Sequence, residues 1–130
     1  MGTDQLQADR MVGVLVDACG WASLVDAGVN LDIALSEVVG EAKLKITGGV
    51  KKELDRLSES RSGLLLDLLY SRSEIIEDEN GHTDDALLSI SAKMSWPVLT
   101  VDRGLKRRLV SEGCSYIEVT SGSTLRLVGP

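Results

Sequence analysis

The sequence predicts a three-layer α/β/α fold with a central, mostly parallel sheet. Short segments rich in valine, isoleucine and leucine alternate with amphipathic segments of helical spacing, which is typical of parallel sheets covered on both faces by right-handed crossover helices. The length of 130 residues fits one domain. With 43% hydrophobic and 26% charged residues, the composition is that of a globular chain rather than a disordered or collagen-like one.

The first half of the chain opens with a polar stretch and then alternates strand and helix patterns. We expect residues 1–10 to be disordered and residues 11–130 to form a single domain. The valine-rich run 12–16 predicts a buried strand that ends at Asp17. The elements expected next are helices over 21–27 and 31–40, a strand over 44–46, a helix over 48–57 capped by Thr47, and a leucine-rich helix over 60–70.

The second half continues the alternation. Residues 73–77 predict a strand, and 78–81 are a turn by composition. Thr83 is expected to open a helix that has acids in its first turn and runs to Met94. The remaining elements are a strand over 97–101 with proline first, a helix over 103–111 capped by Asp102, and terminal strands over 116–119 and 124–128.

Cysteine spacing, net charge and hydropathy exclude several classes of protein. Cys19 and Cys114 form no paired motif, so neither a zinc site nor a disulfide framework is indicated. A net charge of -6 argues against a protein that coats a phosphate backbone over its whole surface. No apolar run approaches the ~20 residues that span a membrane. The start of the chain also lacks the pattern of a signal peptide, so we expect a cytoplasmic protein with no membrane association.

Acidic residues recur where predicted strands end and the following helices begin. In an open α/β sheet these positions share one edge, where such folds bind ligands. Each acid alone is explained as a helix cap or a solvated side chain. Carboxylates crowded together would repel one another unless a cation neutralised them, and the hard cations Mg²⁺ and Mn²⁺ prefer oxygen ligands. The acids are Asp17, Glu53, the pair Asp84 and Asp85, and Asp102.

Four sequence segments together resemble the PIN-domain family of metal-dependent ribonucleases. They are VLVDACGWASL at 14–24, KKEL at 51–54, TDDALLSISAK at 83–93 and LTVDRGLKRRL at 99–109. The resemblance is closest to an archaeal branch similar to ribosomal RNA-processing nucleases and to toxins of the virulence-associated protein C type. It implies four catalytic acids at Asp17, Glu53, Asp85 and Asp102, an adjacent acid at Asp84 that shares or replaces the role of Asp85, and a supporting hydroxyl at Thr100.

The activity implied by the resemblance is Mg²⁺- or Mn²⁺-dependent endonucleolytic hydrolysis of RNA. The metal ligands would come from Asp17, Asp84, Asp85 and Asp102, while Glu53 would orient or deprotonate the attacking water. The family usually has Asn or Ser where this chain has Cys19. A PIN fold kept as a catalytically weak or inactive RNA- or protein-interaction module is therefore an alternative. A phosphoacceptor receiver domain is disfavoured, because Ala18 follows Asp17 and no lysine lies near Val119.

The helix that follows Asp102 carries the candidate RNA-binding side chains. Helical spacing places Leu105, Leu109 and Val110 on its buried arc. The opposite side of this helix is then exposed, and it either binds RNA phosphates or only keeps the protein soluble. Partners compatible with the resemblance are an RNA substrate, a second copy of the chain, and an antitoxin or pre-ribosomal partner. The candidate RNA contacts are Arg103, Arg107 and Arg108.

Overall fold

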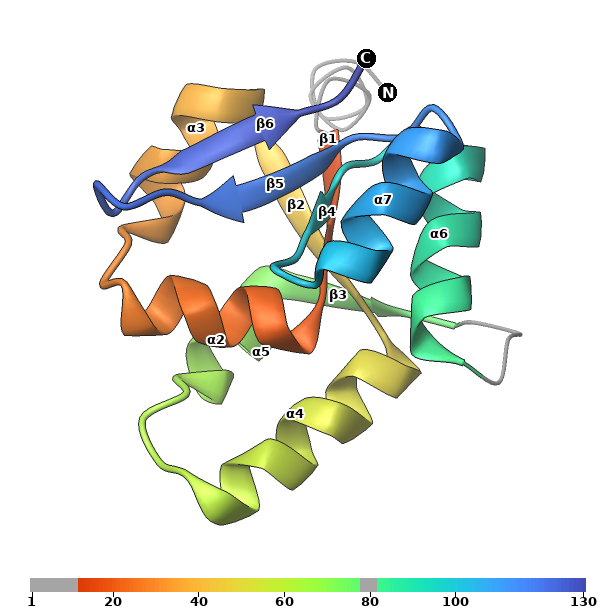
Figure 1. Cartoon of the computed structure of the whole chain (residues 1–130). Helices are drawn as coiled ribbons and strands as arrows, with labels where there is room; N and C mark the ends of the chain where they lie inside the picture. The colour runs from red at the N-terminus through yellow and green to blue at the C-terminus, as the bar shows by residue number, and fades with distance from the viewer. Residues whose placement is uncertain (1–11, 78–81) are drawn as a thin grey trace, which may run out of the picture.

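The computed structural model describes residues 12–77 and 82–130. The segment 1–10 and the predicted turn at 78–81 lie outside the described residues. The elements alternate along the chain as expected, and the helices cover the central sheet (Figure 1). In chain order they are β1 (Val12–Val16), α2 (Ala18–Asp26), α3 (Leu31–Val39), β2 (Ala42–Thr47), α4 (Gly48–Ser60), α5 (Leu66–Arg72), β3 (Ser73–Ile76), α6 (Thr83–Met94), β4 (Val98–Leu99), α7 (Arg103–Ser111), β5 (Tyr116–Val119) and β6 (Leu125–Val128).

The sheet has six strands in the order β3-β2-β1-β4-β5-β6. Every pairing is parallel except that of β5 with β6, which is antiparallel. The predicted three-layer fold with a mostly parallel sheet is therefore confirmed. β1 lies at the centre between β2 and β4, so the carboxyl ends of β1 and β4 are neighbours, with Val16 opposite Leu99.

The core explains why the central strand contains no polar alternation. Val14, Leu15 and Val16 are fully buried, as expected for a parallel strand covered on both faces. α2 lies directly against β4, because a Cβ placed on Gly20 would be 2.3 Å from the carbonyl oxygen of Leu99. This close approach fixes the start of α2, where Asp17 is the N-cap, beside the end of β4.

The bounds of several elements differ from the sequence prediction: α2 begins at Ala18 instead of residue 21, and α4 continues to Ser60 instead of residue 57. The leucine-rich helix predicted over 60–70 begins only at Leu66, because Gly63 and Leu65 adopt positive φ values of 78° and 54° that interrupt a helix. The strand predicted over 97–101 shortens to β4, because the chain turns after Leu99 into the N-cap of α7. α6 begins at Thr83 and ends at Met94 as predicted, and His82 occupies its N-cap position without a side-chain capping bond.

No helix in the described ranges 12–77 and 82–130 is long and apolar enough to cross a membrane.

Candidate functional site

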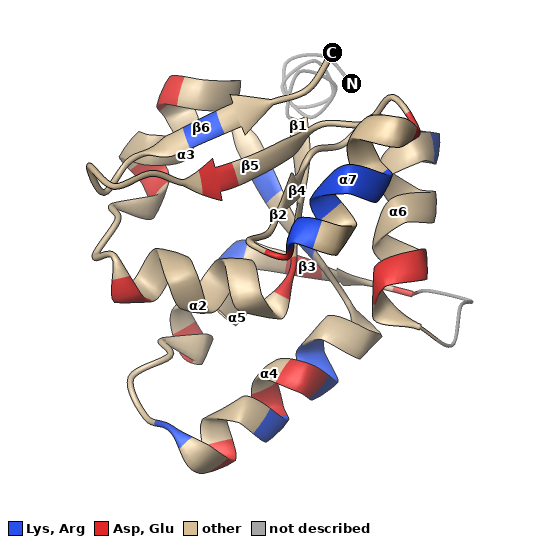
Figure 2. Ribbon diagram, in the orientation of Figure 1, with Lys and Arg blue, Asp and Glu red and all other residues tan. Residues whose placement is uncertain are grey.

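Four helices begin at the same edge of the sheet, the edge at which β1 and β4 end (Figure 1). The first turns of α4 and α6 touch, since a Cβ placed on Gly49 would lie 2.9 Å from Thr83 Oγ1. Acidic segments mark the starts of α2, α6 and α7 and the early turns of α4 on this side of the molecule (Figure 2). The predicted gathering of acids at one edge therefore has a structural basis in four separate elements.

Asp17 is the most constrained of these acids. It is only 5% exposed, and its Oδ1 accepts a hydrogen bond from the Ala18 backbone N–H at 2.9 Å. Its Oδ2 accepts one from Thr100 Oγ1 at 2.8 Å and one from Cys19 Sγ at 3.2 Å. Burial and then the charge of Asp17 raise the pKa of the Cys19 thiol, which keeps it protonated as the donor. Three donors thus fix the orientation of this carboxylate.

Thr100 connects Asp17 to Asp102. The Thr100 side chain is fully buried, and its Oγ1 also accepts a hydrogen bond from the Asp102 backbone N–H at 3.1 Å. The Asp102 side chain in turn caps α7, accepting from the Leu105 N–H at 2.9 Å. A single hydroxyl therefore holds the ends of β1 and β4 in register at the point where both carboxylates emerge.

Asp84 and Asp85 are neighbours in sequence but lie in different electrostatic environments. Partial burial, followed by the charges of Asp17, Asp102 and Glu53, raises the pKa of the Asp84 carboxyl. Asp85 instead pairs with Arg108, whose Nη2 lies 2.6 Å from its Oδ1. This hydrogen bond lowers the pKa of the Asp85 carboxyl. The structure thus brings Asp84 into the group of acids and directs Asp85 to α7.

Glu53 joins this group from α4. It follows the N-terminal turn of the helix, which begins at Gly48 after the N-cap Thr47. Its side chain is exposed on the flank of α4, and its charge reaches Asp84. We call Asp17, Glu53, Asp84 and Asp102 the carboxylate cluster.

The carboxylate cluster suits a hard cation by its chemistry. All of its donors are carboxylate oxygens, which Mg²⁺ and Mn²⁺ prefer. Burial and, after it, the charges of Asp17, Asp102 and Glu53 raise the pKa of Asp84, and a bound cation would offset the part due to charge. Within the described residues, however, no three Asp, Glu, His or Cys side chains are close enough together to hold a metal ion as they stand. Holding a cation would require these side chains to move closer together.

The arginines of α7 lie beside the carboxylate cluster in two different states. Arg103 and Arg107 are exposed, and no carboxylate within the described part of the chain forms an ion pair with either. Arg108 is engaged by Asp85. Val110, predicted on the buried arc, is 48% exposed, because α7 contacts the core through the i, i+4 pair Leu105 and Leu109 alone.

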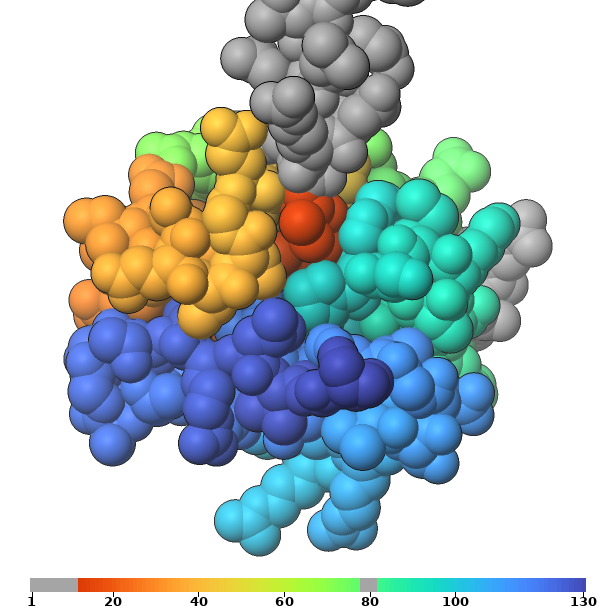
Figure 3. Space-filling view, turned by 90° about the horizontal axis from the view of Figure 1, so that it is seen from above, coloured from red at the N-terminus to blue at the C-terminus, as the bar shows by residue number. Residues whose placement is uncertain are grey.

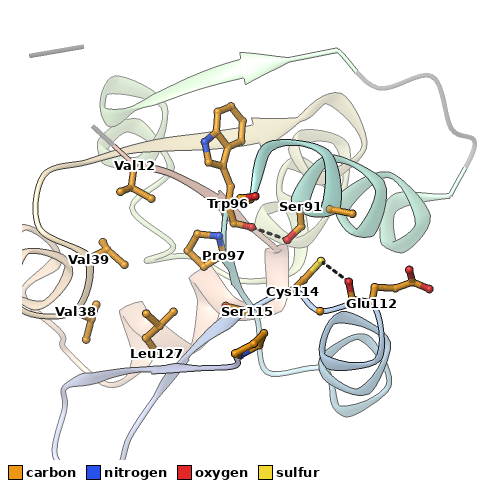
Figure 4. A pocket seen from close by; sticks show the side chains of 14 residues that line it. Val12, Val38, Val39, Ser91, Trp96, Pro97, Glu112, Cys114, Ser115 and Leu127 are labelled. Carbon is orange, nitrogen blue, oxygen red and sulfur yellow. Dashed lines mark hydrogen bonds between the residues drawn. The ribbon is translucent and has the colours of Figure 1, made fainter. Parts of the chain in front are cut away.

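The opposite edge of the sheet has a different character. There the starts of the strands surround a hollow of about 460 Å³, viewed from above in Figure 3 and from close by in Figure 4. Trp96 and Pro97 line it, Leu127 closes one side, and Ser91 donates a hydrogen bond to the Trp96 carbonyl. Among the lining residues that the structure describes, Glu112 has the single charged side chain.

Comparison with protein families identifies the fold. A family model described as "PIN like domain" matches residues 14–121. The chain belongs to the PIN-like domain family. Among solved structures, this PIN-like domain is similar to the PIN domain endonuclease Utp24, with a TM-score of 0.78 and 18% sequence identity over 93% of this chain and 94% of that one. A search of curated proteins finds no significant match.

Two contacts in the site could not be inferred from the sequence. The hydrogen bond from Cys19 to Asp17 depends on how the first turn of α2 folds over β1, and only the i, i+2 spacing hinted at it. The pair of Asp85 with Arg108 joins residues 23 positions apart on two helices. Nothing in the adjacent acids Asp84 and Asp85 distinguishes them before the helices are placed.

Proposed function

We propose that this PIN-like domain is a divalent-metal-dependent endoribonuclease that hydrolyses RNA phosphodiester bonds. The observation that carries the proposal is the carboxylate cluster, in which acids from four elements share one edge of the sheet (Figure 2). Burial raises the pKa of Asp84, and the charges of the other three acids raise it further. The likeness to a protein named as a PIN domain endonuclease supports the same class of reaction.

Three acids of the carboxylate cluster would bind the divalent cation. Asp17 and Asp102 would hold Mg²⁺ or Mn²⁺, because Thr100 fixes both at the end of adjacent strands. Asp84 would complete the set, in place of Asp85, which is engaged by Arg108. A bound divalent cation supplies a lowered pKa for the attacking water and charge neutralisation at the phosphate.

Glu53 would act on the attacking water, and the arginines of α7 would bind the RNA or position other residues. Glu53 is exposed and has no ion pair within the described ranges, so it is free to accept a proton from water or to orient it. Arg103 and Arg107 lie on the exposed side of α7 and would bind phosphates on one side of the cluster. Arg108 would act indirectly, by holding Asp85 away from the carboxylate cluster.

Cleavage of an end-labelled single-stranded oligoribonucleotide tests the proposal. We expect internal cuts with Mg²⁺ or Mn²⁺, none after treatment with EDTA, and recovery when the metal is restored. Asp17→Asn should abolish cleavage, whereas Asp67→Asn, which changes an exposed acid of α5, should not. Cleavage in EDTA or an active Asp17→Asn protein would contradict the proposal. RNA binding without cleavage in any metal would favour the inactive interaction module instead.

A further inference from the structure

We propose that α4 carries a second phosphate-binding strip, made of Lys52 and Arg56, and that an RNA strand crosses the carboxylate cluster between this strip and Arg103 and Arg107 of α7. The inference rests on the proposed function, because it assigns a path to the substrate of that site. It adds a surface on a different helix from the one that the sequence singled out.

The basic residues of α4 fall into two groups. Lys51 is held by Asp55, with Nζ 2.8 Å from Oδ2, and also lies over the ring of Tyr70. Arg61, at the end of α4, is held by Asp26 at 2.6 Å. Lys52 and Arg56 have no carboxylate at ion-pair distance within residues 12–77 and 82–130.

Lys52 and Arg56 share one exposed side of the helix. They are four residues apart, so their side chains are neighbours on the helix surface. Val50 and Leu54 occupy the opposite, fully buried side. Arg56 follows Glu53 by three residues, so the strip is the helix-surface neighbour of the acid whose charge reaches Asp84.

α7 repeats this arrangement on the other side of the cluster. Arg103 and Arg107 are also four residues apart and exposed, while Lys106 is held by Glu118 at 2.9 Å and Arg108 by Asp85. Basic segments accordingly appear on both α4 and α7, with acidic segments between them (Figure 2).

This distribution suits a polyanion that must approach acids. Four carboxylates repel a phosphate backbone to the extent that a bound cation does not neutralise them, so cationic side chains on both sides would favour a strand that lies across them. Cations already engaged by protein carboxylates have less to gain from phosphate than free ones, so Lys52 and Arg56 are the side chains of α4 suited to this contact. The paired residues Lys51 and Arg61 provide a matched control of equal charge.

The salt dependence of RNA binding tests the strip. Binding of a labelled single-stranded oligoribonucleotide would be measured by fluorescence anisotropy in the Asp17→Asn background at fixed Mg²⁺ over a KCl series. Removing both cations with Lys52→Ala and Arg56→Ala should flatten the log–log slope by about 1.4, at ~0.7 per phosphate contact. The control pair Lys51→Ala and Arg61→Ala makes the same change in net charge and should leave the slope within about 0.3 of the parent.

The outcomes separate this inference from the proposed function. Rescue of the slope by Lys52→Arg with Arg56→Lys would support phosphate contact, and circular dichroism of each variant would confirm folding. An unchanged slope in the Lys52→Ala, Arg56→Ala protein, with a flattened slope in Arg103→Ala, Arg107→Ala, would overturn the α4 strip and leave the nuclease proposal intact. Equal flattening by the Lys51 and Arg61 control would also overturn it, since net charge alone would then explain the effect. Absence of RNA binding by the parent would overturn both.

Discussion

The two edges of the sheet are built from opposite chemistry. At the carboxyl edge, four elements deliver carboxylates, and only Asp17 among the four is buried. At the amino edge the strands start around a hollow that Trp96, Pro97 and Leu127 help to line (Figure 4). Trp96 lies so close to Gly13 that a Cβ on Gly13 would be 2.3 Å from the ring. The strands therefore end beside carboxylates that could bind a cation, and they begin beside side chains that pack closely.

This difference follows from how parallel strands connect to helices. Each crossover helix starts near the carboxyl edge, where its unpaired N–H groups and positive dipole end stabilise acids. Asp17 and Asp102 are the N-caps of α2 and α7, and each side chain accepts a hydrogen bond from a backbone N–H of the first turn. The amino edge receives the helix C-termini, whose negative dipole ends favour cations over acids, and Trp96 packs closely against Gly13 there. Substitution of the carboxylates at the carboxyl edge should accordingly affect activity, whereas substitution of a tightly packed residue at either edge should affect stability.

The largest expected effect is the loss of activity on changing a cluster acid. Asp102→Asn should reduce RNA cleavage by more than about 100-fold, because changes merely next to metal ligands already cost 10–100-fold. Cys114→Ala, a buried change in the lining of the amino-edge hollow, should leave the rate per folded molecule unchanged. Rates would be measured on a fluorescent oligoribonucleotide. Equal losses in both variants would break the division between the two edges.

The next effect is on folding, at the glycines that allow close approach. Gly20→Ala would place a Cβ 2.3 Å from the backbone carbonyl of Leu99, which cannot move aside easily. Gly13→Ala meets the Trp96 ring at the same distance. Overpacking of this kind costs about 1–3 kcal/mol, and we expect Gly20→Ala to cost more than Gly13→Ala.

Denaturant unfolding would measure both changes in the free energy of unfolding. Gly122→Ala is the control, because no atom lies within 4 Å of a Cβ placed there. Unfolding midpoints of Gly20→Ala and Gly13→Ala equal to that of the control would show that the close approaches are relaxed without cost.

Much of the carboxyl edge could be predicted from sequence, because it depends on local signals. A valine run followed by Asp17, and a strand followed by the capping residue Asp102, place both acids without knowledge of tertiary structure. The choice between Asp84 and Asp85 depends on which side of α6 faces α7, which local patterns do not specify. The interruption at Gly63 and Leu65 was hidden by leucine periodicity that continues across it.

A smaller effect should separate the two acids of α6. Asp84→Asn should weaken the stabilisation given by Mn²⁺, which for a cation that binds only the folded state reaches about 2.7 kcal/mol at a hundred times its dissociation constant. Asp85→Asn removes an exposed ion pair with Arg108, and such pairs contribute about 0–1 kcal/mol. It should therefore leave the Mn²⁺ response nearly intact.

Thermal unfolding with and without Mn²⁺ would measure this difference, and cleavage rates should follow the same order. The assignment of Asp84 to the carboxylate cluster would be wrong if Asp85→Asn lost the response and Asp84→Asn kept it.

The smallest effect concerns Glu118 of β5. Cations surround this acid, whereas the acids of the carboxylate cluster are surrounded by other carboxylates. Hydrogen bonds from Lys106 and then from Arg126 lower the pKa of the Glu118 carboxyl below its ordinary value of 4.5. In the acid range the unfolded chain therefore binds more protons here than the folded one, so this contribution to stability is present above pH 4.5 and is lost as the pH falls through the lowered pKa.

Glu118→Gln should reduce the fall in melting temperature on acidification below pH 4.5. Glu37→Gln, an exposed acid of α3 with no ion pair among the described residues, should leave the fall unchanged. If the melting temperatures of the Glu118→Gln and parent proteins fell identically with pH, the cations beside β5 would add no stability. Paired and unpaired acids would then contribute equally to the free energy of unfolding.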